Sequence, residues 1–165
     1  MALKPFTVRR ATLADAATIA RLSTAFNVEV GKPHAIFSEV QVRRDGFGAG
    51  GDFRVVLAEV EGDAIGYALY QPCFNSDLPG WGTWLSDLFV EAPHRGAGIG
   101  RALLAAVAAE TLAAGGASVE WGVRAENTRG RAFYARVGAR DDDIRLLGLV
   151  GDALRRLADE ARRGA

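Results

Sequence analysis

Three glycines in the segment Arg95-Gly96-Ala97-Gly98-Ile99-Gly100 are the residues whose type and spacing most clearly suggest chemistry. Glycines let the backbone approach a ligand closely, because no side chain stands in the way. The apolar run after the loop predicts a helix, and a helix N-terminus carries partial positive charge that favours an anion. Arg95 and Arg101 flank the turn and add positive charge. The segment therefore predicts a phosphate or pyrophosphate site, with a plain glycine-rich turn as the alternative interpretation.

The spacing of these glycines excludes two familiar phosphate loops. The Walker loop has Lys and then Ser or Thr after its last glycine, whereas Gly100 is followed by Arg101 and Ala102. The dinucleotide fingerprint has a third glycine after two further residues, and counted from Gly96 and Gly98 that position is Arg101. The loop therefore belongs to another class of anion site.

Apolar periodicity predicts the elements that position this loop. We expect a strand at Thr83–Val90 before it and a helix at Ile99–Leu112 after it. Further expected strands are Phe6–Arg9, Phe53–Val60, Ala64–Cys73, Ser118–Arg124 and Ile144–Val150. The composition of Asn75–Gly82 predicts a loop. Further expected helices begin at Thr12, span His34–Arg44, run from Asn127 to Val137, and run from Ala153 to about Arg162. This order predicts an α/β chain with a mixed sheet.

The composition narrows the class of protein. The 165 residues suit a single domain spanning 1–165, and 20 basic residues balance 20 acidic ones, so nothing predicts a nucleic-acid partner. His34 and His94 lie far apart and Cys73 is the only cysteine, so we expect no metal site. No apolar stretch approaches 18 residues, which predicts neither a signal peptide nor a membrane span and makes the cytoplasm the expected location.

The glycine loop resembles the acyl-CoA loop of the GNAT superfamily of N-acyltransferases. That loop reads Arg or Gln, two residues, Gly, one residue, then Gly or Ala, and Arg95, Gly98 and Gly100 match it. A second family segment follows at Asn127–Gly138, and the resemblance covers roughly residues 5 to 150. It implies a sheet whose fourth and fifth strands splay apart, with acetyl-CoA as co-substrate in the slot. It also implies direct transfer of the acetyl group to an amine in a ternary complex.

The resemblance assigns roles to individual residues. Tyr134 aligns with the tyrosine that protonates the thiolate, although aromatic packing is the alternative, and Asp87 could orient the amine or accept its proton, although a structural carboxylate is equally open. Asn127 matches a pantetheine contact and is also a good helix N-cap. A backbone amide near Phe89 or Val90, where the strand is expected to bulge, would bind the oxyanion. The full set expected to bind the cofactor is Leu88, Phe89, Val90, Arg95, Gly96, Ala97, Gly98, Ile99, Gly100, Arg101 and Asn127.

Within the superfamily, the chain resembles most the diamine (spermidine/spermine) acetyltransferase branch. The shared segments include Asp45-Gly46-Phe47-Gly48 and Leu85–Val90. That branch usually has Glu immediately before the strand Asp, whereas this chain has Ser86. We therefore expect a small-molecule amine acceptor that is cationic but is not a long polyamine. By family resemblance we also expect a homodimer. The residues expected to contact the acceptor are Glu29, Trp84, Ser86 and Glu120, with a solvated charge at Glu29 and core packing at Trp84 as alternatives. Two other functions stay open: an acyl-CoA-binding module without turnover, and transfer to a protein or peptide amine.

Overall fold

The computed structural model describes residues 4–77 and 80–163 of the chain. The chain divides into two compact units, one ending at Trp121 and one beginning at Gly122. The first unit holds the whole sheet and the glycine loop, and the second holds the segment with Tyr134. The expectation of one domain over 1–165 stays a prediction.

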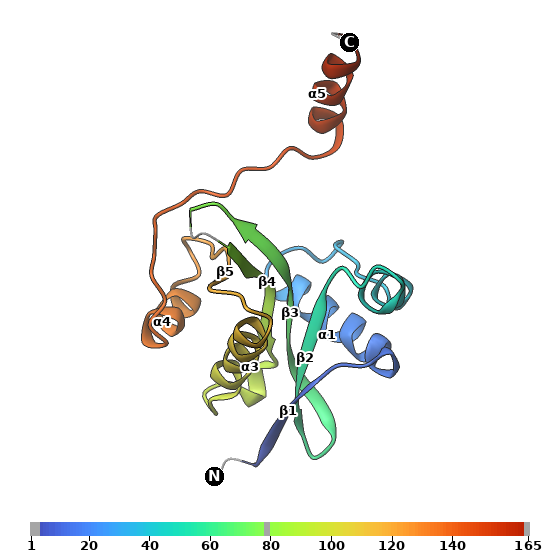
Figure 1. Cartoon of the computed structure of the whole chain (residues 1–165). Coiled ribbons are helices and arrows are strands. Elements are labelled where there is room, and N and C mark those ends of the chain that lie inside the picture. The colour runs from blue at the N-terminus through green and yellow to red at the C-terminus, as the bar shows by residue number, and fades with distance from the viewer. Residues whose placement is uncertain (1–3, 78–79, 164–165) are drawn as a thin grey trace. The chain divides into compact units, whose positions relative to one another are not determined.

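A five-stranded mixed sheet in the order β1-β2-β3-β4-β5 forms the centre of the first unit (Figure 1). Neighbouring strands from β1 to β4 are antiparallel, and β5 is parallel to β4. This confirms the predicted α/β fold class with a mixed sheet. The strands are β1 Phe6–Arg10, β2 Arg54–Val60, β3 Asp63–Asn75, β4 Gly80–Val90 and β5 Val119–Glu120.

Two long helices, α1 (Ala16–Glu29) and α3 (Ile99–Ala113), cover opposite faces of the sheet (Figure 1). Because side chains alternate along a strand, β3 sends Tyr67 and Leu69 into the core under α1, and Tyr70 lies on the other face. Both tyrosines are almost completely buried. The two faces of the sheet are therefore separate environments for these two tyrosines.

The N-terminal elements differ in detail from the prediction. Helix α1 follows a 3₁₀ turn at Leu13–Asp15, whereas the predicted helix begins at Thr12. The helix expected over His34–Arg44 begins only at α2, Glu39–Gln41, and continues as a π-helical turn over Val42–Gly46. The reason is local: Ser38 and Gln41 form a capping box that sets the helix start there.

Strands β4 and β5 separate soon after they pair. The strand expected over Ser118–Arg124 is only Val119–Glu120, and its register with β4 covers Thr83 and Trp84. Beyond Trp84, β4 continues to Val90 alongside β3 alone, as the predicted splay requires. The loop expected at Asn75–Gly82 is shorter, because β4 begins at Gly80, and its residues 78 and 79 lie outside the described residues.

The second unit contains α4 (Thr128–Arg136) and α5 (Gly151–Arg163). The strand expected at Ile144–Val150 is wrong, since residues 139–150 have no regular secondary structure. Their apolar pattern is that of a strand, but a strand forms only where a neighbouring edge accepts its hydrogen bonds, and these residues have no pairing. Ile144, Leu146 and Leu147 are accordingly exposed. Across the described ranges, no helix combines the length and the apolar character that a membrane crossing requires.

Candidate active site

The glycine loop joins the end of β4 to the start of α3 through a 3₁₀ turn at Ala92–His94. Gly96 and Gly98 both adopt φ of +83°, a left-handed conformation, and a Cβ at either would meet no atom within 4 Å. The amide of Ala102 bonds to the carbonyl of Gly98, so the amides before it are those that a helix leaves without an intrahelical acceptor. The loop thus offers open space and backbone donors at a positive helix end, which fits a phosphate group.

The Arg95 side chain turns back toward β4. Its Nε donates to the carbonyl of Val90 at 2.6 Å, its terminal nitrogen pairs with the Glu29 carboxylate, and its guanidinium lies 5.6 Å from the centre of the Phe89 ring. Glu29 is the last residue of α1. The structure therefore brings together two residues that the sequence assigns to different ligands, Arg95 to the cofactor and Glu29 to the acceptor. Arg101, on the first turn of α3, is exposed.

Strand β4 carries a β-bulge at Ser86. The register with β3 pairs Asp87 with Leu69 and Leu85 with Tyr70, which leaves Ser86 as the extra residue. The bulge therefore lies at Ser86 and not at Phe89 or Val90, which pair regularly with Tyr67 and Gly66.

The bulge turns two consecutive side chains of β4 to the same face. The Ser86 hydroxyl donates to Gln71 Oε1 at 2.9 Å, and Asp87 Oδ2 accepts from the Tyr67 hydroxyl at 2.8 Å. Tyr67 and Gln71 are four residues apart on β3 and so share one face. In a regular strand Ser86 and Asp87 would have pointed to opposite faces.

Residues 88 to 90 contribute mainly backbone. Phe89 is buried in the core beside Phe26 and Tyr67, and Leu88 and Val90 are half-buried. The amide of Glu91 donates to the Ile65 carbonyl on β3. Because amides alternate between the two edges of a strand, the Val90 amide points to the edge facing away from β3, where an oxyanion could accept it.

Asp87 is a half-buried carboxyl with a perturbed pKa. Burial raises its pKa, while the hydrogen bond from Tyr67 and the positive charge of Lys32 oppose the rise. A carboxyl whose pKa is raised is a stronger base than an exposed one, which suits it to accept a proton.

The remaining acceptor candidates adjoin this bulge. Trp84 pairs in register with both Gln71 on β3 and Glu120 on β5, and Glu120 Oε1 accepts from the Asn75 side chain at 2.5 Å. Trp84, Ser86 and Glu120 therefore lie on neighbouring strand positions near Asp87. Glu29 is not in this group but beside Arg95.

Tyr134 and Asn127 belong to the second unit. Asn127 caps α4, since its Oδ1 accepts from the Gly130 amide at 2.9 Å. Tyr134 packs against Phe133 with ring centres 5.2 Å apart, and burial raises its pKa, so the phenol is protonated at neutral pH. Asn127 is therefore a helix N-cap and Tyr134 packs against an aromatic ring. These are the alternative roles that the sequence left open beside cofactor binding and catalysis.

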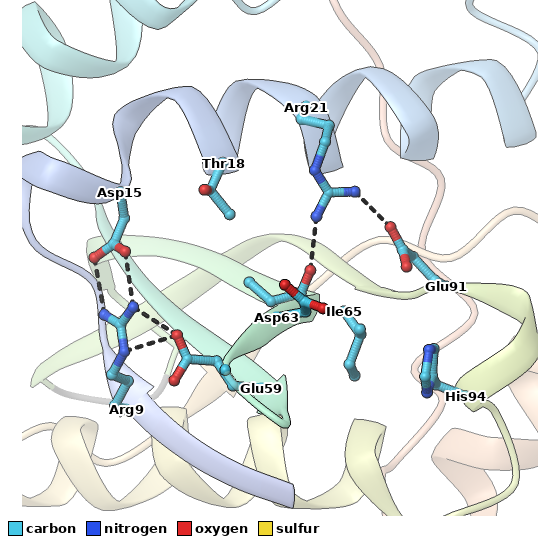
Figure 2. Close-up of a pocket in the computed structure, with 11 residues that line it drawn as sticks. Arg9, Asp15, Thr18, Arg21, Glu59, Asp63, Ile65, Glu91 and His94 are labelled. Atoms are coloured by element: carbon cyan, nitrogen blue, oxygen red, sulfur yellow. Dashed lines mark hydrogen bonds and ion pairs between the residues drawn. The ribbon is translucent and has the colours of Figure 1, made fainter.

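A cavity of about 550 Å³ lies elsewhere in the first unit, between α1, the β2–β3 turn and the 3₁₀ turn at Ala92–His94 (Figure 2). Its walls hold ion pairs: Arg9 bridges Asp15 and Glu59, and Arg21 bonds to Glu91 and to the Ala64 carbonyl. None of the residues predicted from the sequence lines it. These charges largely satisfy one another.

Sequence reasoning missed three residues that contact or influence the candidate base and its neighbour: Tyr67, Gln71 and Lys32. Alternation along β3 could have placed Tyr67 and Gln71 on one face. It could not have located the bulge that brings both Ser86 and Asp87 to them.

Residues 20–139 match the Acetyltransferase (GNAT) family, and the chain belongs to that family. Curated relatives are N-acetyltransferases. An L-ornithine N5-acetyltransferase of Arabidopsis thaliana is 38% identical over 90 residues, covering 54% of this chain and 40% of that protein. A thialysine N-epsilon-acetyltransferase of Sus scrofa is 30% identical over 133 residues, covering 73% of this chain and 78% of the relative. The chain is thus an acetyltransferase related to enzymes named for small-molecule amines.

Solved structures support the same fold. An aminoglycoside acetyltransferase from an uncultured soil metagenomic sample, in complex with trehalose, superposes with a TM-score of 0.76 at 16% identity. The match covers 88% of this chain and 97% of that one. At this identity the likeness concerns the fold alone.

Proposed function

We propose that this chain transfers the acetyl group of acetyl-CoA directly to a primary amine of a small cationic molecule, in a ternary complex. The observation that carries the proposal is the position of Asp87. A half-buried carboxyl with a raised pKa lies at a bulge of β4, three residues before the strand end that leads into the glycine loop. Acetyl transfer to an amine needs a base and an acyl-CoA site close together, and this strand supplies both.

The glycine loop supports acetyl-CoA as the co-substrate. Gly96 and Gly98 leave space for a pyrophosphate, and the first amides of α3 face it without intrahelical acceptors. Under this proposal the loop holds the pyrophosphate, and the β4 edge near Val90 meets the thioester carbonyl. Asn127 would contact the pantetheine arm through its amide nitrogen, since its oxygen already caps α4.

The reaction needs two proton transfers. The neutral amine attacks the thioester carbon, and the Val90 amide stabilises the resulting oxyanion. Asp87 accepts the proton that the amine nitrogen loses as the new C–N bond forms, directly or through water. The C–S bond breaks and the departing thiolate takes up a proton, a donor role that the family resemblance assigns to Tyr134. No acyl-enzyme is needed, and Cys73, whose pKa is raised by burial, lies outside these steps.

The charges near the bulge support a cationic acceptor. Asp87 and Glu120 are acidic and neighbour Trp84, whose aromatic face suits an ammonium group. Ser86 supplies a hydroxyl where the diamine branch has Glu, so this position adds no second charge. We infer a short diamine or an amino acid with a side-chain amine, the class to which the ornithine and thialysine of the relatives' names belong.

A turnover screen tests this proposal. Free-thiol release from acetyl-CoA is measured with short diamines, basic amino acids, aminoglycosides, spermine and an N-terminal peptide. Asp87→Asn is expected to lower kcat/KM on the order of 10²-fold or more with the best acceptor, the scale for losing a general base. The matched control is Asp63→Asn, an exposed carboxylate at the β2–β3 turn, with unchanged turnover.

Other outcomes would redirect the assignment. Spermine clearly exceeding every shorter amine would contradict the weight placed on Ser86. Activity on the peptide alone would replace the small-molecule acceptor. Acetyl-CoA binding without turnover on any amine would leave an acyl-CoA-binding module.

We also propose that the protein is a cytoplasmic homodimer, as family resemblance suggests. Exposed apolar side chains at Leu146, Leu147, Leu154 and Leu157 support association, because such groups gain from being covered. Sedimentation giving a monomer at micromolar concentration would remove the dimer.

A further inference from the structure

Tyr67 is an unusual residue for the core beneath the candidate base. Its side chain has no exposed surface, yet its hydroxyl reaches the face where the acceptor is expected and donates to Asp87 Oδ2 at 2.8 Å. Ser23 of α1 lies near the Tyr67 hydroxyl and lowers the pKa of Tyr67, against the rise that burial causes. Ser23 is itself 2% exposed. The buried Tyr67 hydroxyl on β3 therefore links the core beneath α1 to the carboxyl on β4.

We propose that Tyr67 is the positioning residue of the acetyl transfer, holding Asp87 by Oδ2 so that the ionised Oδ1 faces the amine. The inference rests on the proposed function of Asp87 and goes beyond it, because it assigns a role to a residue that touches neither substrate. Phe89 packs against the Tyr67 ring, with centres 6.3 Å apart, and so limits its movement.

The physical reason is the conflict that burial creates. Burial favours the protonated form of Asp87, which cannot accept a proton, and a hydrogen bond donated to the carboxylate favours the charged form. Among the described residues, two groups oppose the effect of burial on the pKa of Asp87. They are the Tyr67 hydroxyl on β3 and the positive charge of Lys32, which follows α1. Lys32 acts by charge alone, whereas Tyr67 also fixes the geometry. Burial raises the pKa of Tyr67 itself, so it remains a donor across the working pH range.

The same strand offers a matched control. Tyr70 lies three residues further on β3, is equally buried, and faces the opposite side of the sheet. Its hydroxyl makes no hydrogen bond within the part of the chain that the structure describes, and burial and the neighbouring Glu110 carboxylate raise its pKa. Tyr67→Phe and Tyr70→Phe therefore remove the same atom from the same kind of environment, and only the first removes a donor to Asp87.

The test is the pH profile of kcat/KM for the full chain, with acetyl-CoA and the best amine of the screen. Tyr67→Phe is expected to move the acid limb to higher pH. For each protein, kcat/KM at low pH is divided by its value at the optimum pH. This ratio is expected to be on the order of tenfold smaller for Tyr67→Phe than for the unsubstituted protein. Tyr70→Phe is expected to keep the original profile. A merely structural role for Tyr67 would lower activity at every pH and leave the limb in place.

A second variant guards against a fold defect. Ser23→Ala keeps Tyr67 but removes the neighbouring hydroxyl that lowers the pKa of Tyr67, so Tyr67 becomes a weaker donor to Asp87. The acid limb should then move in the same direction by a smaller amount. An unmoved acid limb in both Tyr67→Phe and Ser23→Ala, with Asp87→Asn inactive, overturns this inference and leaves the proposed function standing. Full activity of Asp87→Asn overturns the role of Asp87 and this inference with it.

Discussion

Replacement of Gly98 by alanine separates the strain of the loop backbone from its role in binding. Gly98 has φ of +83°, and alanine in the left-handed region costs about 1–2 kcal/mol. A Cβ there would meet no atom within 4 Å in the free protein, so no steric cost is added. For a chain of this size the melting temperature should fall by about 2–8 °C.

Gly62, at the turn between β2 and β3, provides the control for that strain. Its φ is +89°, and a Cβ there would also meet nothing within 4 Å. Gly62→Ala should therefore lower the melting temperature by a similar amount. Its turn is not part of the glycine loop, so acetyl-CoA binding should be unchanged.

The two variants should differ only when ligand is added. At 100 times its Kd, acetyl-CoA stabilises the folded chain by about 2.7 kcal/mol, a rise in melting temperature of about 5–10 °C. If the Cβ of Gly98→Ala occupies the space of the pyrophosphate and weakens binding about 100-fold, the same concentration gives about 0.4 kcal/mol, or about 1–2 °C. Differential scanning fluorimetry with and without acetyl-CoA measures both numbers. Equal ligand-induced shifts in Gly98→Ala and Gly62→Ala would refute the assignment of the loop.

Two further predictions concern residues of the candidate site, and a third concerns the stability of the fold. Tyr134→Phe should keep acetyl-CoA binding and lower kcat on the order of 10²-fold, measured by thiol release; unchanged kcat would assign Tyr134 to packing. Glu29→Gln should tighten acetyl-CoA binding up to about fivefold by calorimetry, because Arg95 is no longer paired with a carboxylate, and weaker binding would contradict this. The Arg9 guanidinium holds the pKa of Asp15 below its usual range, so Asp15→Asn should cost about 1–2 kcal/mol at pH 7. Since a depressed pKa stabilises the fold above the unfolded-state value, that difference should shrink in urea titrations as the pH falls below about 4.

The sequence predicted the order of elements well because strong local signals mark them. Gly98 at the start of α3 and Asn127 at the start of α4 lie where the sequence placed them. The prediction of a strand at Ile144–Val150 was wrong because its outcome depends on a partner strand and not on a local signal. An apolar pattern reports what a segment could bury, and pairing depends on an available edge, which no local pattern contains.

The site was predicted less completely than the fold. The sequence identified Asp87, Trp84 and Glu120; register pairs Trp84 with Glu120, and Asp87 follows Trp84 by three residues on β4. It could not find the ion pair of Arg95 with Glu29, because those residues are 66 positions apart and their contact depends on how α1 meets the end of β4. Nor could it find Tyr67, which resembles any core aromatic until the bulge brings Asp87 to it.

The bulge also gives a physical meaning to the serine before Asp87. Because Ser86 and Asp87 reach the same face, a carboxylate at position 86 would lie beside Asp87 and disfavour its ionised form. A hydroxyl bonded to Gln71 avoids that repulsion. Burial is then the main effect that raises the pKa of Asp87, and the hydrogen bond from Tyr67 opposes it. Under the proposed function, attraction of the ammonium group then falls to Glu120, paired with Trp84 on the next strand. The chain thereby separates the carboxylate that binds positive charge from the carboxylate that must remove a proton, two tasks that oppose each other when one group performs both.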